Sequence, residues 1–304
     1  MAHFDKASGA VQAVKAMSLI DKTRDADGNC PVRSCGTHRN VEQVLKNYAE
    51  WIKDNRLGDL RHSTPKSAES YLLERAEEVQ QKTLDQIRQG IEIYQHVTGA
   101  LPTDQHLPII QSQIESKLEH RAYTPEQVQA IMAHQTPANA LATELAYYAG
   151  LRAHELITIR PIAEQQPDDR SGQKDISEYK FAGREGVHYT VVGKGGLCRE
   201  VVLSKELADR LEEHRLAQPV EVVDRQVKYQ CYYAIGHGNA FSKSFSDASK
   251  RALGWSTGAH GLRHSYVQER MKELQSRCDY ETAKLTLSNE VGHFRFQITT
   301  TYLR

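Results

Sequence analysis

The chain has 304 residues, of which 39% are hydrophobic and 26% charged, a composition typical of folded globular proteins and unlike that of disordered ones. This length exceeds what one compact core usually holds, so two domains are expected. The 39 basic and 39 acidic residues cancel, and the net charge gives no global sign of nucleic-acid binding. No apolar run reaches the length of a membrane span, and the first ten residues lack the apolar core of a secretory signal. We therefore expect a cytoplasmic protein.

Five cysteines are scattered along the chain, at positions 30, 35, 198, 231 and 278. An odd number at irregular spacing does not indicate a disulfide framework. The stretch CPVRSCGTH brings Cys30, Cys35 and His38 close together, but it offers no fourth ligand and its spacing is loose for zinc. Free thiols in a linker are the favoured interpretation, and no metal is expected.

The N-terminal part is expected to be helical. Residues 4–20 suggest a short helix, and the polar, turn-forming stretch DKTRDADGNCPVRSCGTHRN after it is typical of a linker. Residues 1–38 are therefore assigned to an N-terminal helix and linker. Residues 39–115 are assigned to a helical domain that ends near Pro102 and Pro108.

Helical periodicity is clear within that domain. Amphipathic helices are predicted over residues 40–56, 64–79 and 82–99. The second opens with Thr64 as its cap and Pro65 at the first helical position, and the third stops near Gly99.

Residues 120–304 show a mixed pattern. The stretch YTPEQVQAIMAHQ has a capping-box-like start at Thr124 and Gln127, and two helical stretches broken at Gly150 follow. The clear strand signals are VHYTVVG and REVVLS, joined by the hairpin-like KGGLC. Helices then resume. The sequence predicts a mainly α protein with a small β-hairpin or sheet.

Seven residues of this domain could carry chemistry. They are Arg152, Glu155, Lys194, His260, Arg263, His293 and Tyr302. Arg152 and Glu155 are three residues apart, which predicts neighbours on one helix face, and the same spacing relates His260 to Arg263. Lys194 lies beside glycines in the hairpin, so a long cation can project from a tight turn.

Each of these residues alone has an ordinary structural interpretation, such as a helix ion pair, an exposed hairpin lysine or a packing tyrosine. Together, two arginines, a lysine and two histidines form a cationic, hydrogen-bonding pocket suited to a phosphate whose charge grows in the transition state. A tyrosine beside such a pocket is a candidate nucleophile. The sequence has neither a P-loop nor a carboxylate cage for magnesium, so no cofactor is expected.

In this order and spacing the motifs GLRAHEL, VVGKGGLCREVVLS, HGLRHSY and VGHFRFQITTTYLR resemble those of the tyrosine recombinase (phage integrase) family, in particular integrases of bacterial mobile elements. The resemblance covers roughly Tyr123 to Arg304. It implies a mixed α/β catalytic domain over residues 120–304. Residues 39–115 are similar, in length and helical pattern only, to that family's core-binding (SAM-like) DNA-binding domain.

The resemblance also implies a mechanism. Tyr302 attacks a DNA phosphodiester to give a 3′-phosphotyrosine and a free 5′-hydroxyl. Arg152 and Arg263 hold the non-bridging oxygens, and Lys194 protonates the departing 5′-oxygen. His260 helps to take the tyrosine proton, because a phenol with a pKa of about 10 is protonated at neutral pH.

Two further residues have supporting roles in this mechanism. His293 donates a hydrogen bond to the phosphate, and Glu155 orients its neighbours without reacting. The covalent link conserves the energy of the phosphodiester, so the same site can reseal a strand without ATP or metal.

The resemblance implies double-stranded DNA with a specific site as the partner, a homotetramer on paired sites as the assembly, and an accessory directionality factor. It implies no membrane association and a location in the bacterial cytoplasm, at the nucleoid. Residues 236–304 carry ten Lys/Arg against six Asp/Glu, a net of +4, which favours an anionic partner at this end. Lys243, Lys250 and Arg251 are candidates for DNA-backbone contacts, with a solvated helix face as the alternative.

Two features depart from the family pattern. Residues 39–115 carry nine basic against twelve acidic residues, a net of −3, whereas a DNA clamp needs a basic inner face. Many family members have a further helix after the tyrosine that couples protomers, so protomer coupling is expected to use another element or to be weaker. The alternative functions are a type IB-like topoisomerase and a non-catalytic DNA-binding accessory protein on the same fold.

Overall fold

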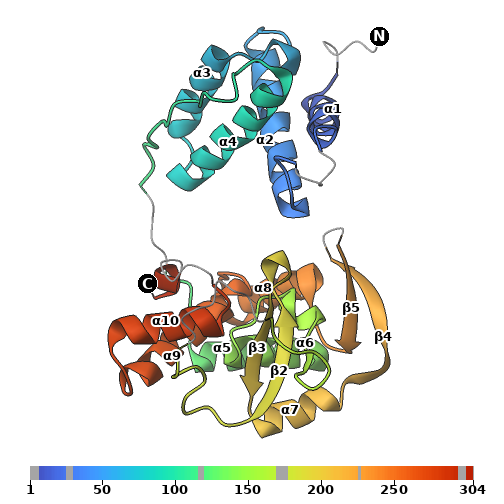
Figure 1. The fold of residues 1–304 in the computed structure, drawn as a ribbon, viewed down its shortest axis with the longest axis vertical. Coiled ribbons are helices and arrows are strands. Elements are labelled where there is room, and N and C mark those ends of the chain that lie inside the picture. Colours follow the sequence, from blue (N-terminus) through green and yellow to red (C-terminus); the bar gives the residue numbers. More distant parts are fainter. Residues whose placement is uncertain are drawn as a thin grey trace. The chain divides into compact units, whose positions relative to one another are not determined.

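The computed structural model describes residues 7–24, 30–115, 120–168, 177–224, 227–293 and 299–303, with only the main chain described at Lys194. The chain divides into two compact units, Met1–Lys117 and Leu118–Arg304 (Figure 1). Each unit buries apolar side chains in a core of its own.

The first unit is a bundle of helices over its described residues. Its elements are α1 (Gly9–Asp21), α2 (Cys35–Asp54), the 3₁₀ turn η2 (Leu60–His62), α3 (Pro65–Ala76) and α4 (Gln81–Thr98). Leu45 and Tyr48 of α2 and Ile91 and Tyr94 of α4 are buried, because each amphipathic helix turns its apolar face to the others.

Helix boundaries in this unit follow the predicted signals. The Ser67 N–H donates to the Thr64 side chain, and Pro65 is the first residue of α3, as predicted. Gly99 ends α4 in the left-handed conformation, with φ of 74°.

The predicted linker over residues 21–40 is wrong in its second half. Helix α2 already begins at Cys35, where Ser34 accepts a hydrogen bond from the Thr37 N–H as a cap. Cys30 and Val32 are buried in the same core as α1. Residues 30–34 are therefore held to the core by apolar side chains, which the interpretation based on the polar residues of this stretch overlooked.

The second unit combines helices with two small antiparallel sheets. Its helices are α5 (Pro125–Met132), α6 (Pro137–Tyr148), α7 (Lys205–Glu212), α8 (Gly238–Leu253), α9 (His260–Gln275) and α10 (Tyr280–Glu290). Its strands are β1 (Arg160–Pro161), β2 (Val187–Val192), β3 (Cys198–Leu203), β4 (Arg215–Asp224) and β5 (Val227–Tyr233). The 3₁₀ turns are η3 (Glu155–Ile157), η4 (Lys194–Gly196) and η5 (Thr300–Tyr302).

The predicted hairpin is confirmed and lies in a sheet of order β1-β2-β3. Strands β2 and β3 pair from Val187↔Leu203 to Val192↔Cys198, which places the turn at residues 193–197. The predicted capping box at the start of α5 is also confirmed. The Gln127 N–H donates to Thr124 Oγ1 at 3.3 Å, and the Thr124 N–H donates to Gln127 Oε1 at 3.0 Å.

Two predictions for this unit are wrong. The stretch after Gly150 was expected to be a second helix, but among the described residues it forms only the 3₁₀ turn η3 before strand β1. Strands β4 and β5 were not expected, although the alternating, β-branched stretch PVEVVDRQVKYQCYY contains the signal.

Helix α9 is the structural centre of the site region, since it is buried on most of its circumference. Its buried residues include the polar side chains Arg263, His264 and Arg270. A helix buried on all sides must find partners for every polar group that it carries. For Arg263 and Arg270 the acceptors are the carbonyls of Gly150 and Ala182 and groups at the end of α10.

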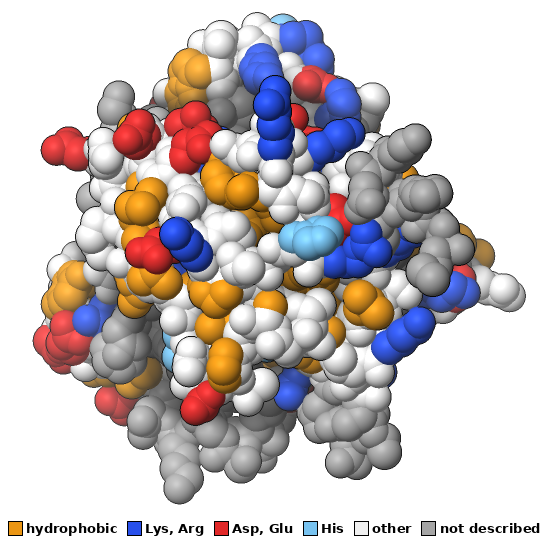
Figure 2. Space-filling view, turned by 90° about the horizontal axis from the view of Figure 1, so that it is seen from above, with side chains coloured by type: hydrophobic (Ala, Val, Ile, Leu, Met, Phe, Trp, Pro, Cys, Tyr) orange, Lys and Arg blue, Asp and Glu red, His pale blue; other side chains and the backbone are white. Residues whose placement is uncertain are grey.

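Charge is unevenly spread on the face shown in Figure 2, where Lys and Arg side chains gather toward the upper right and Asp and Glu toward the left. No helix among the described residues has the length and apolarity needed to cross a membrane.

Candidate active site

Arg152 and Glu155 form the first part of the site. Gly150 has φ of 60°, which ends α6 and turns the chain, so Arg152 does not lie on a helix as expected. The pair forms nevertheless, because the Arg152 N–H and Nη1 donate to the two Glu155 carboxylate oxygens at 2.8 and 2.6 Å. The predicted contact between Arg152 and Glu155 therefore forms, but in a compact turn and not on the face of a helix.

Arg263 lies fully buried on α9, beside this pair. Its Nη1 donates to the Gly150 carbonyl at 2.6 Å, and its Nη2 donates to the Val291 carbonyl. The Glu155 carboxylate is 3.6 Å from Nη1. The guanidinium thus links the end of α6 with the end of α10.

Arg199 of β3 is a third arginine at Glu155, and it was missed in the sequence. Its Nη2 donates to Glu155 Oε2 at 2.7 Å, and the side chain is only 4% exposed. The available signal was an arginine in the short strand CREVVL, since an arginine in a buried position requires a partner.

Glu155 is completely buried among these three arginines. Burial alone would raise the pKa of its carboxyl, but the arginine charges outweigh burial and hold the pKa well below its usual range. Burial, followed by the charge of Arg152, lowers the pKa of Arg263 to about 9, which leaves it cationic at neutral pH. Three positive charges around one negative charge leave a net positive site.

Tyr302 lies in η5 and is 7% exposed. Its hydroxyl is 3.1 Å from Nε2 of His260, the first residue of α9. Burial, and next the charge of Arg263, lower the pKa of His260 to about 3, so the imidazole is neutral and an unprotonated Nε2 can accept the phenol proton. The Arg263 guanidinium carbon lies 5.9 Å from the centre of the Tyr302 ring.

The residues at one-turn spacing after His260 also hold Tyr302, and sequence reasoning missed them. The His264 ring lies 4.5 Å from the Tyr302 ring, centre to centre. Gln268 Nε2 donates to the Tyr302 carbonyl at 3.2 Å. Burial, and next the charge of Arg121, lower the pKa of His264 to about 4. The signal was the i, i+4, i+8 repeat of hydrogen-bonding residues along one face of α9.

His293 follows the end of α10. The Gly292 backbone has φ of 66°, and the His293 N–H donates to the Ser288 carbonyl at 2.9 Å. Its ring nitrogens lie 3.2 Å from Thr299 Oγ1 and 3.4 Å from Arg263 Nη2. Burial and then Arg263 lower the pKa of His293 to about 3, so it too is neutral.

The main chain at Lys194 lies in the β2–β3 turn, followed by Gly195 and Gly196. A Cβ atom at Gly193 would lie 3.1 Å from Glu155 Oε1 and 3.8 Å from Arg152 Nη1. The hairpin turn therefore runs directly beside the Arg152–Glu155 pair.

The structure thus brings six of the seven predicted side chains into one cluster, with the backbone of the seventh at its edge. The three candidates for DNA-backbone contacts lie on α8 and have mixed surroundings. Lys243 pairs with Asp247 at 2.7 Å, Arg251 donates to the His134 carbonyl at 2.8 Å, and Lys250 is exposed. In the part of the chain that the structure describes, no group of three or more His, Cys, Asp or Glu side chains could hold a metal ion.

No protein-family model matches the sequence, and no curated protein matches it. Solved structures with a similar fold include the Tn1549 transposon integrase in complex with transposon right-end DNA, at 13% identity over 95% of this chain and 94% of that one, with a TM-score of 0.57. A lambda integrase dimer bound to a COC′ core site matches at 16% identity over 97% of this chain and 76% of that one, with a TM-score of 0.59.

The site-specific recombinase XerH bound to its difH substrate matches at 15% identity over 98% of this chain and 94% of that one, with a TM-score of 0.53. These proteins confirm the predicted resemblance to tyrosine recombinases and the predicted fold class. At such identities the likeness concerns the fold.

Proposed function

We propose that this chain is a site-specific DNA recombinase that cuts and rejoins DNA through a 3′-phosphotyrosine intermediate. The observation that carries the proposal is the 3.1 Å contact between Tyr302 Oη and His260 Nε2, beside a net positive cluster of buried arginines. This arrangement combines a nucleophile, a base and an anion site, which is what phosphoryl transfer without a dedicated cofactor requires.

In the proposed cleavage step the phenolic proton of Tyr302 passes to His260, and the phenolate oxygen attacks the phosphorus of a DNA phosphodiester. The bond from phosphorus to the 5′-oxygen breaks, and Lys194 supplies the proton that this oxygen needs. Arg152 and Arg263 stabilise the charge on the non-bridging oxygens, and His293 donates a further hydrogen bond. Religation is the reverse reaction with a new 5′-hydroxyl.

The depressed pKa of His260 fits this sequence of events. Burial and the arginine charges keep the imidazole neutral before DNA binds. The negative charge of a bound phosphodiester would oppose the arginine field and raise the pKa of His260, which makes it a better base when substrate is in place. The phosphate itself would therefore activate the base.

The finer proposal is that the recombinase integrates or excises a bacterial mobile element. The structural neighbours include the Tn1549 transposon integrase in complex with transposon right-end DNA and lambda integrase bound to a COC′ core site. We propose double-stranded DNA with a specific site as the substrate and a homotetramer on two such sites as the active assembly, aided by an accessory directionality factor. Residues 39–115 would bind DNA as a core-binding domain.

Capture of the covalent intermediate tests the proposal. A pool of nicked duplexes with randomised arms is incubated with the protein and resolved on a denaturing gel, and DNA that stays attached to protein is sequenced. The expected result is an adduct with an enriched target sequence. The Tyr302→Phe variant keeps the ring packed against α9 but lacks the nucleophile, so it should give no adduct. No adduct from the wild-type chain on any sequence in the pool would refute the proposal.

Two paired substrates then separate the alternative functions. Exchange of strands between two captured sites supports a recombinase. Relaxation of supercoils without exchange between sites would support the type IB-like topoisomerase, and sequence-specific binding without an adduct would support the accessory protein.

A further inference from the structure

We propose that Arg199 is a positioning residue that acts through Glu155 to keep Arg152 and Arg263 available to the phosphate. This inference rests on the proposed recombinase function. Arg199 does not have to touch DNA in this role. It would set the charge and orientation of the carboxylate that both phosphate-binding arginines share.

The contacts of Arg199 connect the main parts of the site. Nη2 donates to Glu155 Oε2 at 2.7 Å and lies 3.5 Å from the Gly150 carbonyl. Nη1 donates to the Glu290 carbonyl at 2.7 Å, at the end of the helix that precedes His293. The residue itself lies on β3, the strand that follows the Lys194 turn. One side chain thus joins three chain segments that carry proposed catalytic groups.

The charge balance explains why the contact to Glu155 should matter most. With Arg199 in place, three cations surround the carboxylate, so Arg152 and Arg263 retain capacity for a second anion. Without Arg199, the buried carboxylate would have only those two cations as partners, and it would compete with the phosphate for both. Removing one partner leaves a buried charge less compensated, so we expect the carboxylate to hold the two remaining arginines in preference to the phosphate.

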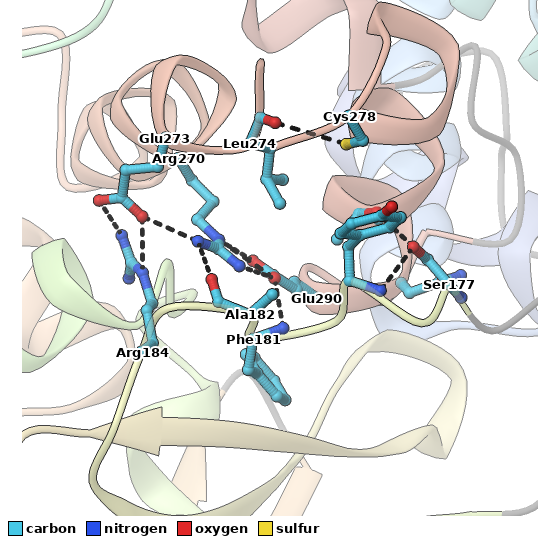
Figure 3. A network of polar contacts seen from close by, with 12 residues as sticks. Ser177, Phe181, Ala182, Arg184, Arg270, Glu273, Leu274, Cys278 and Glu290 are labelled. Carbon is cyan, nitrogen blue, oxygen red and sulfur yellow. Dashed lines mark hydrogen bonds and ion pairs between the residues drawn. The ribbon is translucent and has the colours of Figure 1, made fainter. Parts of the chain in front are cut away.

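Arg270 offers a matched control, because it is also a buried arginine that meets Glu290 (Figure 3). Its Nε donates to both Glu290 carboxylate oxygens at 3.1 Å, and its Nη1 donates to the Ala182 carbonyl at 3.0 Å. No contact joins it to Glu155 among the described residues. Loss of Arg270 therefore removes a buried arginine of similar structural importance without changing the charge at Glu155.

A double-mutant cycle tests the inference. Arg199→Met and Arg270→Met are each made alone and together with Glu155→Gln, and single-turnover adduct formation is measured on a captured target duplex at saturating protein. Thermal unfolding is measured in parallel. Arg199→Lys is included because it keeps the positive charge, and Arg199→Gln, which also removes the charge, replaces Arg199→Met in the cycle if that variant does not fold.

Arg199→Met should slow adduct formation about 10- to 100-fold, by analogy with residues that orient metal ligands through a hydrogen bond. Together with Glu155→Gln, the same change should alter the rate by no more than about twofold, because the competing charge is already gone. Arg199→Lys should recover part of the rate. Arg270→Met should have the same effect with either residue at position 155.

Equal effects of Arg199→Met in both backgrounds would overturn the inference, since the arginine would then act only by supporting the fold. This result differs from failure of the proposed function, in which the wild-type chain itself forms no adduct.

Discussion

Arg263 and Arg152 are proposed to bind the same phosphate, yet the structure predicts a much larger loss of stability when Arg263 is replaced than when Arg152 is replaced. Arg263→Met would leave the buried Gly150 and Val291 carbonyls without their guanidinium donors and remove one cation from Glu155. Breaking a buried charge cluster in this way costs about 3–5 kcal/mol. Arg152 has a 21% exposed side chain whose described ion pair is with Glu155, so Arg152→Met should cost only about 1–2 kcal/mol.

Both variants should lose adduct formation by about 10²–10³-fold, the cost of removing one donor from a transition-state anion site. The second unit should therefore be about 2 kcal/mol less stable with Arg263→Met than with Arg152→Met, while the two chemical defects are similar. Arg263 is therefore expected to serve both catalysis and folding, whereas Arg152 is expected to serve mainly catalysis.

The two tryptophans make the measurement specific to the second unit. Trp51 lies in the first unit, and Trp255 lies in the second, where its ring stacks on Tyr123 at 5.3 Å. In a Trp51→Phe background, the fluorescence change in urea reports unfolding of the second unit alone. The reasoning is refuted if Arg152→Met destabilises this unit as much as Arg263→Met does, or if Arg263→Met leaves the adduct rate within about tenfold of the wild type.

Three further predictions follow from the same geometry. The pKa values of His260, His264 and His293 are lowered below 6.5 in the folded state, so the unfolded state binds more protons at acidic pH. The second unit should therefore lose stability as pH falls from 6.5 toward 4, by up to about 1.4 kcal/mol per pH unit for each histidine. His264→Asn should reduce the number of protons taken up on unfolding by one, measured from urea midpoints against pH, and an unchanged slope would contradict this prediction. Lys194→Ala should slow cleavage of ordinary DNA about 10²–10⁴-fold but leave cleavage nearly intact when sulfur replaces the bridging 5′-oxygen, because a thiolate departs without a proton; an equal loss on both substrates would exclude the proton-donor role. Gly292→Ala should reduce both stability and adduct rate, because Gly292 has φ of 66° and the new Cβ would lie 2.8 Å from Arg199 Cδ. Gly254→Ala should reduce only stability, by about 1–2 kcal/mol, because Gly254 has φ of 81° but open space around the added Cβ. Similar adduct rates for the two variants would contradict the packing argument.

Much of the fold could be predicted because its signals are local. The capped starts at Thr64 and Thr124, the helix end at Gly99 and the β2–β3 hairpin each follow from a few neighbouring residues. Prediction failed where distant contacts decide the outcome. Cys30 is buried in a core that helices distant along the chain build together.

In the candidate site, too, residues with local sequence signals were found and residues defined by distant contacts were missed. The seven residues were found because the order of their motifs resembles a known family, and the structure brings six of these side chains together. Arg199 was not found because its role depends on a partner 44 residues earlier in the chain. His264 and Gln268 were missed because the i, i+4, i+8 repeat along α9 shows only that they share a face with His260, and the contact of that face with Tyr302 depends on the folded chain.

Tyr302 hydrogen-bonds to His260 and packs on helix α9, and both belong to the same chain as the tyrosine. If the protein acts as proposed, each subunit of an assembly would carry a complete set of reacting groups for the strand that it holds. Two differently damaged subunits, one lacking Tyr302 and one lacking Arg152, could then not repair each other when mixed. Genetic complementation between such alleles should fail, and a mixed assembly should cut only the strands held by its intact members.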